Sequence, residues 1–335
     1  MRPHLKEAGL NGWRPRAAAA AVLVLLAVGC SSPQLTTPDT PATTTPAAPA
    51  PGRTAARVIV VVEENHSIGQ IIGSPQAPFL NRLAAKGVLL TSDFAITHPS
   101  LPNYIAMVSG DTQGITSDCG GCNVDAPNLA DQLDAAGISW KAYMEDLPAP
   151  CSDAHRAGAY AKKHDPFMYF TSVRDDPGRC AKVVPFGQLD ADLATGRLPR
   201  LVFVTPNLHH DMHGAGEGGD EAALTGAADR WLEGLYGKLA GSSAWQEDTR
   251  LVVTWDEGRG DGAGGPTGCC GGLATGGNVA TIIAGPRVKA AHDDATYTHY
   301  ALLRSIETLF HLPYLGHAGD PTTSTIPALA GPSRP

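Results

Sequence analysis

The chain has 335 residues, a formal net charge of −8 and 43% hydrophobic residues, enough for a large globular core. From Arg57 onward, 20 Lys and Arg stand against 31 Asp and Glu, and this acidic balance argues against nucleic acid as a partner. It also indicates that a bound phosphate would be held by a metal ion rather than by a basic patch.

The first 29 residues are predicted to be a lipoprotein signal peptide. A basic flank precedes the uncharged apolar run Ala17–Val28, which is shorter than the roughly 20 residues of a membrane-spanning helix. The run ends in Ala27–Cys30 (Ala-Val-Gly-Cys), which resembles a bacterial lipobox and implies cleavage before Cys30 and acylation of its sulfur. The alternative is ordinary secretion with an incidental cysteine. The lipobox predicts an exported protein that is lipid-anchored at the extracytoplasmic face of the cell membrane.

Residues 30–56 are predicted to be the acylated cysteine followed by a tether. This segment is rich in Pro, Thr and Ala, and two residues in it are charged, Asp39 and Arg53. Such a composition cannot bury a core, so we expect a flexible spacer between the anchor and the domain. The following residues, 57–335, suffice for one large domain.

Short apolar runs alternate with helical patterns through this domain. Strands are expected at residues 58–62, 88–90, 138–143, 201–204, 251–254 and 281–284, and helices at 78–86, 127–136, 221–239 and 302–310. Strands that alternate with helices predict an α/β fold with a mostly parallel central sheet covered by helices on both faces. Ligands of such sheets bind outside the carboxyl ends of the strands.

Polar clusters follow three of the expected strands. The clusters are Glu63–Ser67, Thr205–His213 and Asp256–Gly258. Because the carboxyl ends of parallel strands meet at one edge of a sheet, we expect these acids, amides and imidazoles to lie together. Carboxylate and amide oxygens suit Mg, Ca or Mn, and imidazole adds Zn and Fe. The sequence therefore predicts a divalent metal ion whose identity stays open.

Ser100 is the candidate nucleophile. Pro99 and Pro102 bracket it, and a helix expected from Tyr104 to Ser109 would place it near a helix N-terminus, which favours a phosphate group. A serine hydroxyl is a weak nucleophile until a base or a metal ion activates it. The predicted metal site beside it is therefore the reason to choose Ser100 as the candidate nucleophile.

Six cysteines remain after Cys30, and an even number in an exported chain favours disulfides. They are Cys119, Cys122, Cys151, Cys180, Cys269 and Cys270. The first four suggest two local pairs, the last two are adjacent, and the connectivity stays open. A zinc site at the first two is a weaker alternative, because no second CxxC pair completes four ligands.

Five motifs occur in an order that is typical of a known family. They are Glu64–Ser67, Ser100–Tyr104, Pro206-Asn207 with Asp211–His213, Trp255–Gly258 and His299–Glu307. Together they resemble the bacterial acid phosphatase and phospholipase C phosphoesterase family of the alkaline-phosphatase-like superfamily. The resemblance implies an alkaline-phosphatase-like fold and a small, single-domain lipoprotein member with its phosphoesterase domain at residues 57–335.

The resemblance also implies roles for single residues. Ser100 would attack phosphorus and carry the phosphoryl group. The implied metal ligands are Glu64, Asn65, Asp256, Glu257, Asp211 and His213. The positions assigned to substrate or phosphate binding are Asn103, His299 and His164.

The sequence therefore predicts an exported, metal-dependent enzyme that hydrolyses phosphate monoesters through a phosphoserine on Ser100. The expected partners are a small phosphate ester or a phospholipid as substrate and, through the anchor, the membrane. One alternative is a phospholipase C-type phosphodiesterase that acts on lipid head groups. The non-enzymatic alternative is a ligand-binding surface lipoprotein on a degenerate hydrolase scaffold, against which the intact Ser100 and Asp256–Glu257 argue.

Overall fold

The computed structural model describes residues 56–214, 220–260, 262 and 265–331. The signal peptide, Cys30 and the tether up to residue 55 lie outside the described residues and stay predictions. Within the described ranges, no helix combines the length and the apolar character needed to cross a bilayer.

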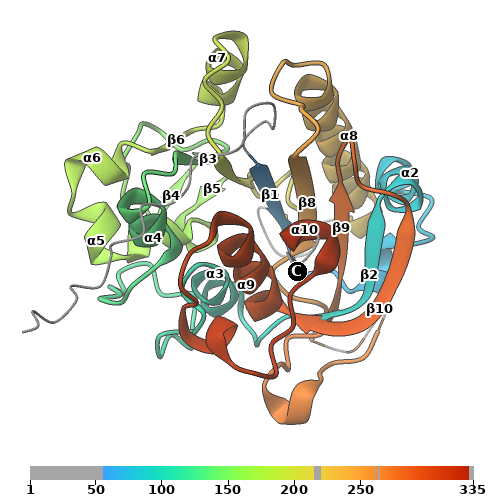
Figure 1. Ribbon diagram of the computed structural model, residues 1–335. Coiled ribbons are helices and arrows are strands. Elements are labelled where there is room, and N and C mark those ends of the chain that lie inside the picture. Colours follow the sequence, from blue (N-terminus) through green and yellow to red (C-terminus); the bar gives the residue numbers. More distant parts are fainter. Residues whose placement is uncertain (1–55, 215–219, 261, 263–264, 332–335) are drawn as a thin grey trace, which may run out of the picture. The chain divides into compact units, whose positions relative to one another are not determined.

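In the described part of the chain, an eight-stranded sheet has the order β10-β2-β9-β8-β1-β7-β3-β6 (Figure 1). Its strands are β1 (Arg57–Glu63), β2 (Val88–Phe94), β3 (Trp140–Met144), β6 (Val183–Pro185), β7 (Leu201–Thr205), β8 (Thr249–Trp255), β9 (Asn278–Ala284) and β10 (Ala291–Thr298). β9 runs antiparallel to β2 and β8, and the other neighbours are parallel. The predicted mostly parallel sheet is confirmed. β4 (Arg156–Ala157) and β5 (Tyr160–Ala161) form a separate small hairpin.

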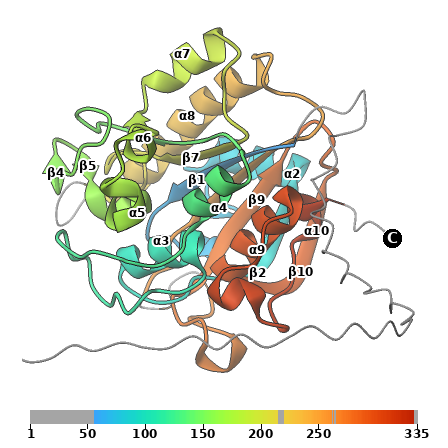
Figure 2. The same ribbon diagram turned by 60° about the vertical axis from the view of Figure 1, so that its left-hand side comes forward.

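Helices cover both faces of the sheet, as Figures 1 and 2 show. One face packs against α3 (Ser100–Ser109), α4 (Leu129–Ala135), α9 (His299–Phe310) and α10 (Pro327–Ala330). The other packs against α1 (Ile68–Ile71), α2 (Pro78–Lys86), α7 (Gln188–Ala194) and α8 (Glu221–Ala240). The short helices α5 (Thr171–Arg174) and α6 (Pro177–Cys180) complete the set.

β1 lies between these two layers, and this position accounts for its unbroken run of apolar residues. Val58, Val60 and Val62 belong to one hydrophobic core, whereas Ile59 and Val61 belong to the other. Because successive side chains of a strand point to opposite faces, a strand buried on both sides needs an unbroken apolar run. The β-branched run that predicted this strand is therefore a direct result of its central position.

The register of β1 brings three strand ends together. Val61 is aligned with Val204 of β7 and with Val253 of β8, so all three strands end at the same edge. The residues that follow them along the chain therefore share this edge, as the sequence predicted.

All six cysteines after Cys30 are paired in disulfides. The bonds are Cys119–Cys122, Cys151–Cys180 and Cys269–Cys270. The two local pairs are confirmed and the adjacent cysteines are bonded to each other. Because the first two sulfurs are joined, they are not available as thiolate ligands, and the zinc alternative does not hold.

Candidate active site

Glu64 connects the end of β1 to the candidate nucleophile. Its side chain is fully buried, its Oε2 accepts a hydrogen bond from Ser100 Oγ at 3.0 Å, and its Oε1 accepts one from Tyr104 Oη at 2.7 Å. Its backbone N–H donates to the carbonyl of Asp211 at 2.8 Å. One residue thus joins the ends of β1 and β7 to α3.

α3 begins at Ser100, four residues earlier than the sequence predicted. The reason is that Pro102 is compatible with the first turn of a helix, where its missing N–H would have no intrahelical partner. Ser100 is therefore the first helical residue itself. Its side chain lies at the positive end of the helix, which favours an approaching phosphate.

Asn103 has contacts that differ from its predicted role. Its Oδ1 accepts hydrogen bonds from the backbone N–H groups of Ile96 and Thr97, and its Nδ2 donates to the carbonyls of Thr97 and Pro99. These bonds hold the segment that precedes Ser100. The structure therefore does not place the Asn103 amide at a substrate-binding position.

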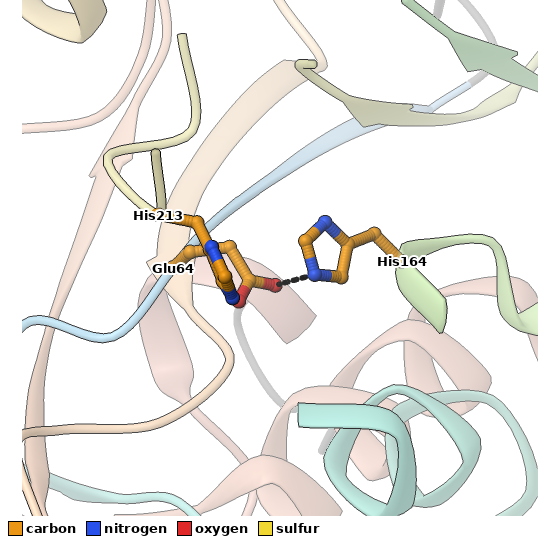
Figure 3. Close-up of side chains that lie close together, drawn as sticks. All are labelled: Glu64, His164 and His213. Atoms are coloured by element: carbon orange, nitrogen blue, oxygen red, sulfur yellow. Dashed lines mark ion pairs between the residues drawn. The ribbon is translucent and has the colours of Figure 1, made fainter. Parts of the chain in front are cut away.

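Glu64, His164 and His213 bring three potential ligand atoms within 4.8 Å of one another (Figure 3). His164 ends the 3₁₀ turn η1 (Lys162–His164), and its Nε2 lies 3.1 Å from Glu64 Oε1. Its Nδ1 lies 3.1 Å from Asp211 Oδ2. His164 was predicted to bind substrate, but the structure places it among the candidate metal ligands.

Asp256 and its neighbours form the adjacent wall of the site. Asp256 Oδ1 accepts hydrogen bonds from the N–H groups of Asn65 at 3.0 Å and Glu257 at 2.6 Å. Glu257 Oε2 lies 2.7 Å from His98 Nδ1. His299 Nε2 lies 2.6 Å from the Asp256 carbonyl oxygen, so His299 supports the Asp256 backbone.

The electrostatics of the cluster fit a cation. Burial and neighbouring acids raise the pKa values of Glu64, Asp211 and Asp256 well above the usual range. Asp256 Oδ2 is buried without a hydrogen-bond partner, and Asp211 Oδ2 and His164 Nε2 are buried with the 3.1 Å ion-pair contacts described above in place of hydrogen bonds. Burial, followed by the charge of Lys163, lowers the pKa of His164 well below its usual range, which keeps the ring neutral and able to ligate.

Lys163 is a site residue that the sequence did not single out. Its Nζ lies 2.8 Å from Asp118 Oδ2, 3.1 Å from His213 Nε2 and 3.5 Å from Ser100 Oγ. Burial lowers its pKa, but the charges of Glu64 and Asp118 more than offset this effect, so the net shift is upward and the ammonium persists.

A cavity of about 270 Å³ opens beside the cluster. Its lining residues are Asn65, His66, His98, Met212, His213, Glu221, Glu257, Gly258, Arg259 and Gly260. Three of the predicted metal ligands therefore face this space. Its walls are mostly polar, which suits a small hydrophilic substrate better than a hydrocarbon chain.

Solved structures share the fold of this chain. The fold matches an alkaline phosphatase superfamily protein from Vibrio parahaemolyticus with a TM-score of 0.55 and 15% identity, covering 81% of this chain and 71% of that one. A phosphonate monoester hydrolase of Agrobacterium radiobacter matches with a TM-score of 0.54 and 15% identity, covering 83% of this chain and 78% of that one. The chain thus has the α/β fold of the alkaline phosphatase superfamily.

Sequence relatives define the family. The model of the Phosphoesterase family matches residues 74–313. A phosphatidylinositol-3-phosphatase of Mycobacterium tuberculosis is 36% identical over 266 residues, which cover 79% of this chain and 80% of that protein. An acid phosphatase of Aspergillus fumigatus is 32% identical over 242 residues, which cover 70% of this chain and 51%, about half, of that protein. The chain belongs to the phosphoesterase family and is a hydrolase of phosphate esters.

Proposed function

We propose that this protein is a metal-dependent phosphatase that hydrolyses phosphate monoesters through a phosphoserine on Ser100. The observation that carries the proposal is the position of Ser100. Its hydroxyl is buried at the first residue of α3 and donates to Glu64, whose carboxylate belongs to the cluster of candidate metal ligands. A serine hydroxyl, a helix N-terminus and a candidate cation site thus lie together.

Glu64, His164 and His213 would hold the ion, with Asp211 and Asp256 beside them. A bound divalent ion would neutralise the phosphoryl oxygens and lower the pKa of the attacking hydroxyl.

In the first step, Ser100 Oγ attacks phosphorus and its proton passes to Glu64, to which it already donates. The P–O bond to the alcohol breaks, and the alcoholate takes a proton from water. In the second step, the hydroxide left from that water attacks the phosphoserine, the P–O bond to Ser100 breaks, phosphate leaves, and Ser100 Oγ takes its proton back from Glu64. Positioning and charge neutralisation supply most of the rate enhancement.

Two observations support monoesters as substrates. The relatives bear the names phosphatidylinositol-3-phosphatase and acid phosphatase, and the cavity beside the cluster is mostly polar. A phosphorylated inositol lipid would join a monoester to a membrane surface, which agrees with the lipid anchor predicted at Cys30. Comparing rates on an aryl phosphate, a phosphoinositide and phosphatidylcholine separates the monoesterase from a phospholipase C-type diesterase.

Trapping the intermediate tests the mechanism. We expect enzyme quenched in acid during turnover of an aryl phosphate to carry one phosphate on the peptide that contains Ser100, measured by mass spectrometry. Active enzyme that never carries this modification under single-turnover conditions would contradict the phosphoserine.

Export and lipid anchoring complete the proposal. The support comes from the lipobox-like sequence before Cys30 and from the three disulfides, which persist in oxidising compartments. Cells expressing Cys30→Ser are expected to release the protein, whereas the native chain should take up labelled palmitate and stay with the membrane fraction.

A further inference from the structure

Lys163 lies between the candidate nucleophile and the candidate metal ligands. Its ammonium reaches both Ser100 Oγ (3.5 Å) and His213 Nε2 (3.1 Å), and its side chain is 19% exposed. Lys163 precedes His164 on η1, so the same turn that brings His164 into the cluster brings a positive charge next to Ser100. This charge faces a site whose other ionisable groups are mainly carboxylates.

Asp118 fixes the position of this ammonium. Its Oδ2 accepts from Lys163 Nζ at 2.8 Å, and its Oδ1 accepts from the N–H of Leu101 at 3.0 Å. One carboxylate therefore ties Lys163 to the first turn of α3, beside Ser100. Asp118 directly precedes Cys119, which is bonded to Cys122 in a disulfide, so the backbone next to this carboxylate is cross-linked.

We propose that Lys163 binds the phosphoryl group that Ser100 accepts, and that Asp118 is its positioning residue. This inference rests on the proposed function. A phosphoryl group attached to Ser100 Oγ carries its remaining oxygens around that atom, within reach of an ammonium that already lies 3.5 Å away. A phosphate monoester is a dianion and would meet the carboxylates of Glu64 and Asp256, so a fixed positive charge offsets a repulsion that the acids create.

The contact with His213 strengthens the inference. In the structure, Lys163 Nζ lies 3.1 Å from His213 Nε2. Because His213 Nδ1 lies 2.9 Å from the Gly214 carbonyl oxygen, Nε2 is the nitrogen that is left to ligate an ion in the candidate cluster. A ligating nitrogen gives its lone pair to the ion and no longer accepts a hydrogen bond. One N–H of Lys163 then becomes free, and the nearest new acceptor is an oxygen of the phosphoryl group.

The test compares Lys163→Met, which removes the charge but keeps much of the volume, with Lys163→Arg and Asp118→Asn in the full-length enzyme. We expect Lys163→Met to lower kcat/KM on an aryl phosphate about 100-fold, in the range seen when one transition-state donor is lost. The inhibition constant of inorganic phosphate should rise at least about 10-fold. Lys163→Arg should recover part of both effects, and Asp118→Asn should shift both in the same direction by about 10-fold.

The matched control is Lys238→Met, because Lys238 forms an exposed surface ion pair with Asp190 (2.9 Å). This variant should match the wild type in kcat/KM and in phosphate inhibition. Binding of inorganic phosphate to the Ser100→Ala protein, with and without Lys163→Met, measured by calorimetry, gives a readout that needs no turnover.

Unchanged phosphate inhibition and unchanged kcat/KM in folded Lys163→Met would overturn the inference, as would a variant that loses thermal stability alone. If Lys163→Met does not fold, the inhibition constants of inorganic phosphate for Lys163→Arg and Asp118→Asn decide instead, and values equal to that of the wild type in both variants would overturn the inference. An active Ser100→Ala enzyme would overturn the proposed function instead. An inactive Ser100→Ala protein beside a fully active Lys163→Met enzyme would overturn this inference alone.

Discussion

The amino and carboxyl ends of β7, β1 and β8 differ in whether the polar side chains there have hydrogen-bond partners. At the amino ends, the Arg57 guanidinium donates to the carbonyls of Pro199 (2.9 Å), Ala244 (2.6 Å) and Leu198 (3.1 Å). At the carboxyl ends, the buried Oδ2 of Asp256 has no hydrogen-bond partner, and the buried Oδ2 of Asp211 has a 3.1 Å contact with His164 Nδ1 in place of a hydrogen bond. Folding normally satisfies such groups, so the carboxyl-terminal edge is the place where the proposed ligand would complete the structure.

The backbone shows the same contrast. Asn65 (φ 53°) and Met212 (φ 76°) follow β1 and β7 at their carboxyl ends in the left-handed region. Asn tolerates this conformation, whereas Met adopts it at a cost in free energy. Strain of this kind persists where the surrounding structure enforces it, and it is often found at functional sites. The carboxyl-terminal edge therefore carries a backbone cost in free energy at Met212.

Ser100→Ala is expected to have the largest effect on this functional edge. Loss of the nucleophile should lower kcat on an aryl phosphate by about four orders of magnitude or more, while metal content stays that of the wild type. Ser109→Ala is the matched control, because the Ser109 hydroxyl on the same helix donates to the carbonyls of Ile105 and Asp111. Equal loss of activity in both variants would point to damage of α3 rather than to chemistry at Ser100.

Removal of the proposed metal ion by a chelator is expected to abolish activity reversibly and to destabilise this edge. Folding raises the pKa values of Glu64, Asp211 and Asp256, so the folded state binds their protons more tightly than the unfolded state does. The free energy of unfolding of the metal-free protein is therefore higher at acid pH and falls as pH rises. The chelated protein should therefore show a Tm that falls from about pH 5 to about pH 8, and added metal should raise Tm more at the higher pH. A metal-induced Tm increase that is equal at both pH values would contradict this account.

Arg57→Met should sharpen the comparison by affecting the opposite edge alone. The loss of three hydrogen bonds to backbone carbonyls should lower the free energy of unfolding by about 2 kcal/mol, measured in urea, with kcat unchanged. Arg82→Met removes an exposed ion pair with Glu233 and should change stability by about 0.5 kcal/mol or less. A fall in kcat in Arg57→Met would show that the two edges are coupled.

Glu307→Gln is expected to give the smallest effect and tests a buried acid outside both edges. Burial raises the pKa of Glu307 on α9 to about 8, so its contribution to stability is present below about pH 4.5 and is lost as pH rises to about 8. The amide can still accept from the Leu315 N–H. We expect the variant to be more stable by about 1 kcal/mol at pH 8 and similar to the wild type near pH 4. Identical unfolding curves at both pH values would rule out a buried neutral Glu307.

Much of the fold could be predicted from the sequence because the core strands carry unbroken apolar runs. β10 was missed because most of its residues are exposed, and an edge strand of polar residues has no apolar pattern to find. β6 was missed because it has only three residues, Val183–Pro185. Both strands are held by neighbours that lie far away in the sequence.

Some residues of the candidate site could likewise be predicted from the sequence and others could not. The acids after β1, β7 and β8 could be placed at one edge, because parallel strands end together. Lys163 and Tyr104 carried a weak signal: Lys163 precedes His164, and Tyr104 lies one helical turn after Ser100. Neither position reveals its partner, since the bonds of Glu64 to Ser100 and Tyr104 span 36 and 40 residues.

The sequence by itself determined the apolar core strands, the order of the polar clusters and the oxygen- and imidazole-rich chemistry of one edge. Only the tertiary structure decided which of these groups face each other: it made Ser100 the first residue of α3, moved His164 among the ligand atoms and left the Asn103 amide bound to backbone. The physical reason is that local pattern specifies burial and strand direction. The distances of about 3 Å that define a site depend on strand register and on how separate helices and turns pack.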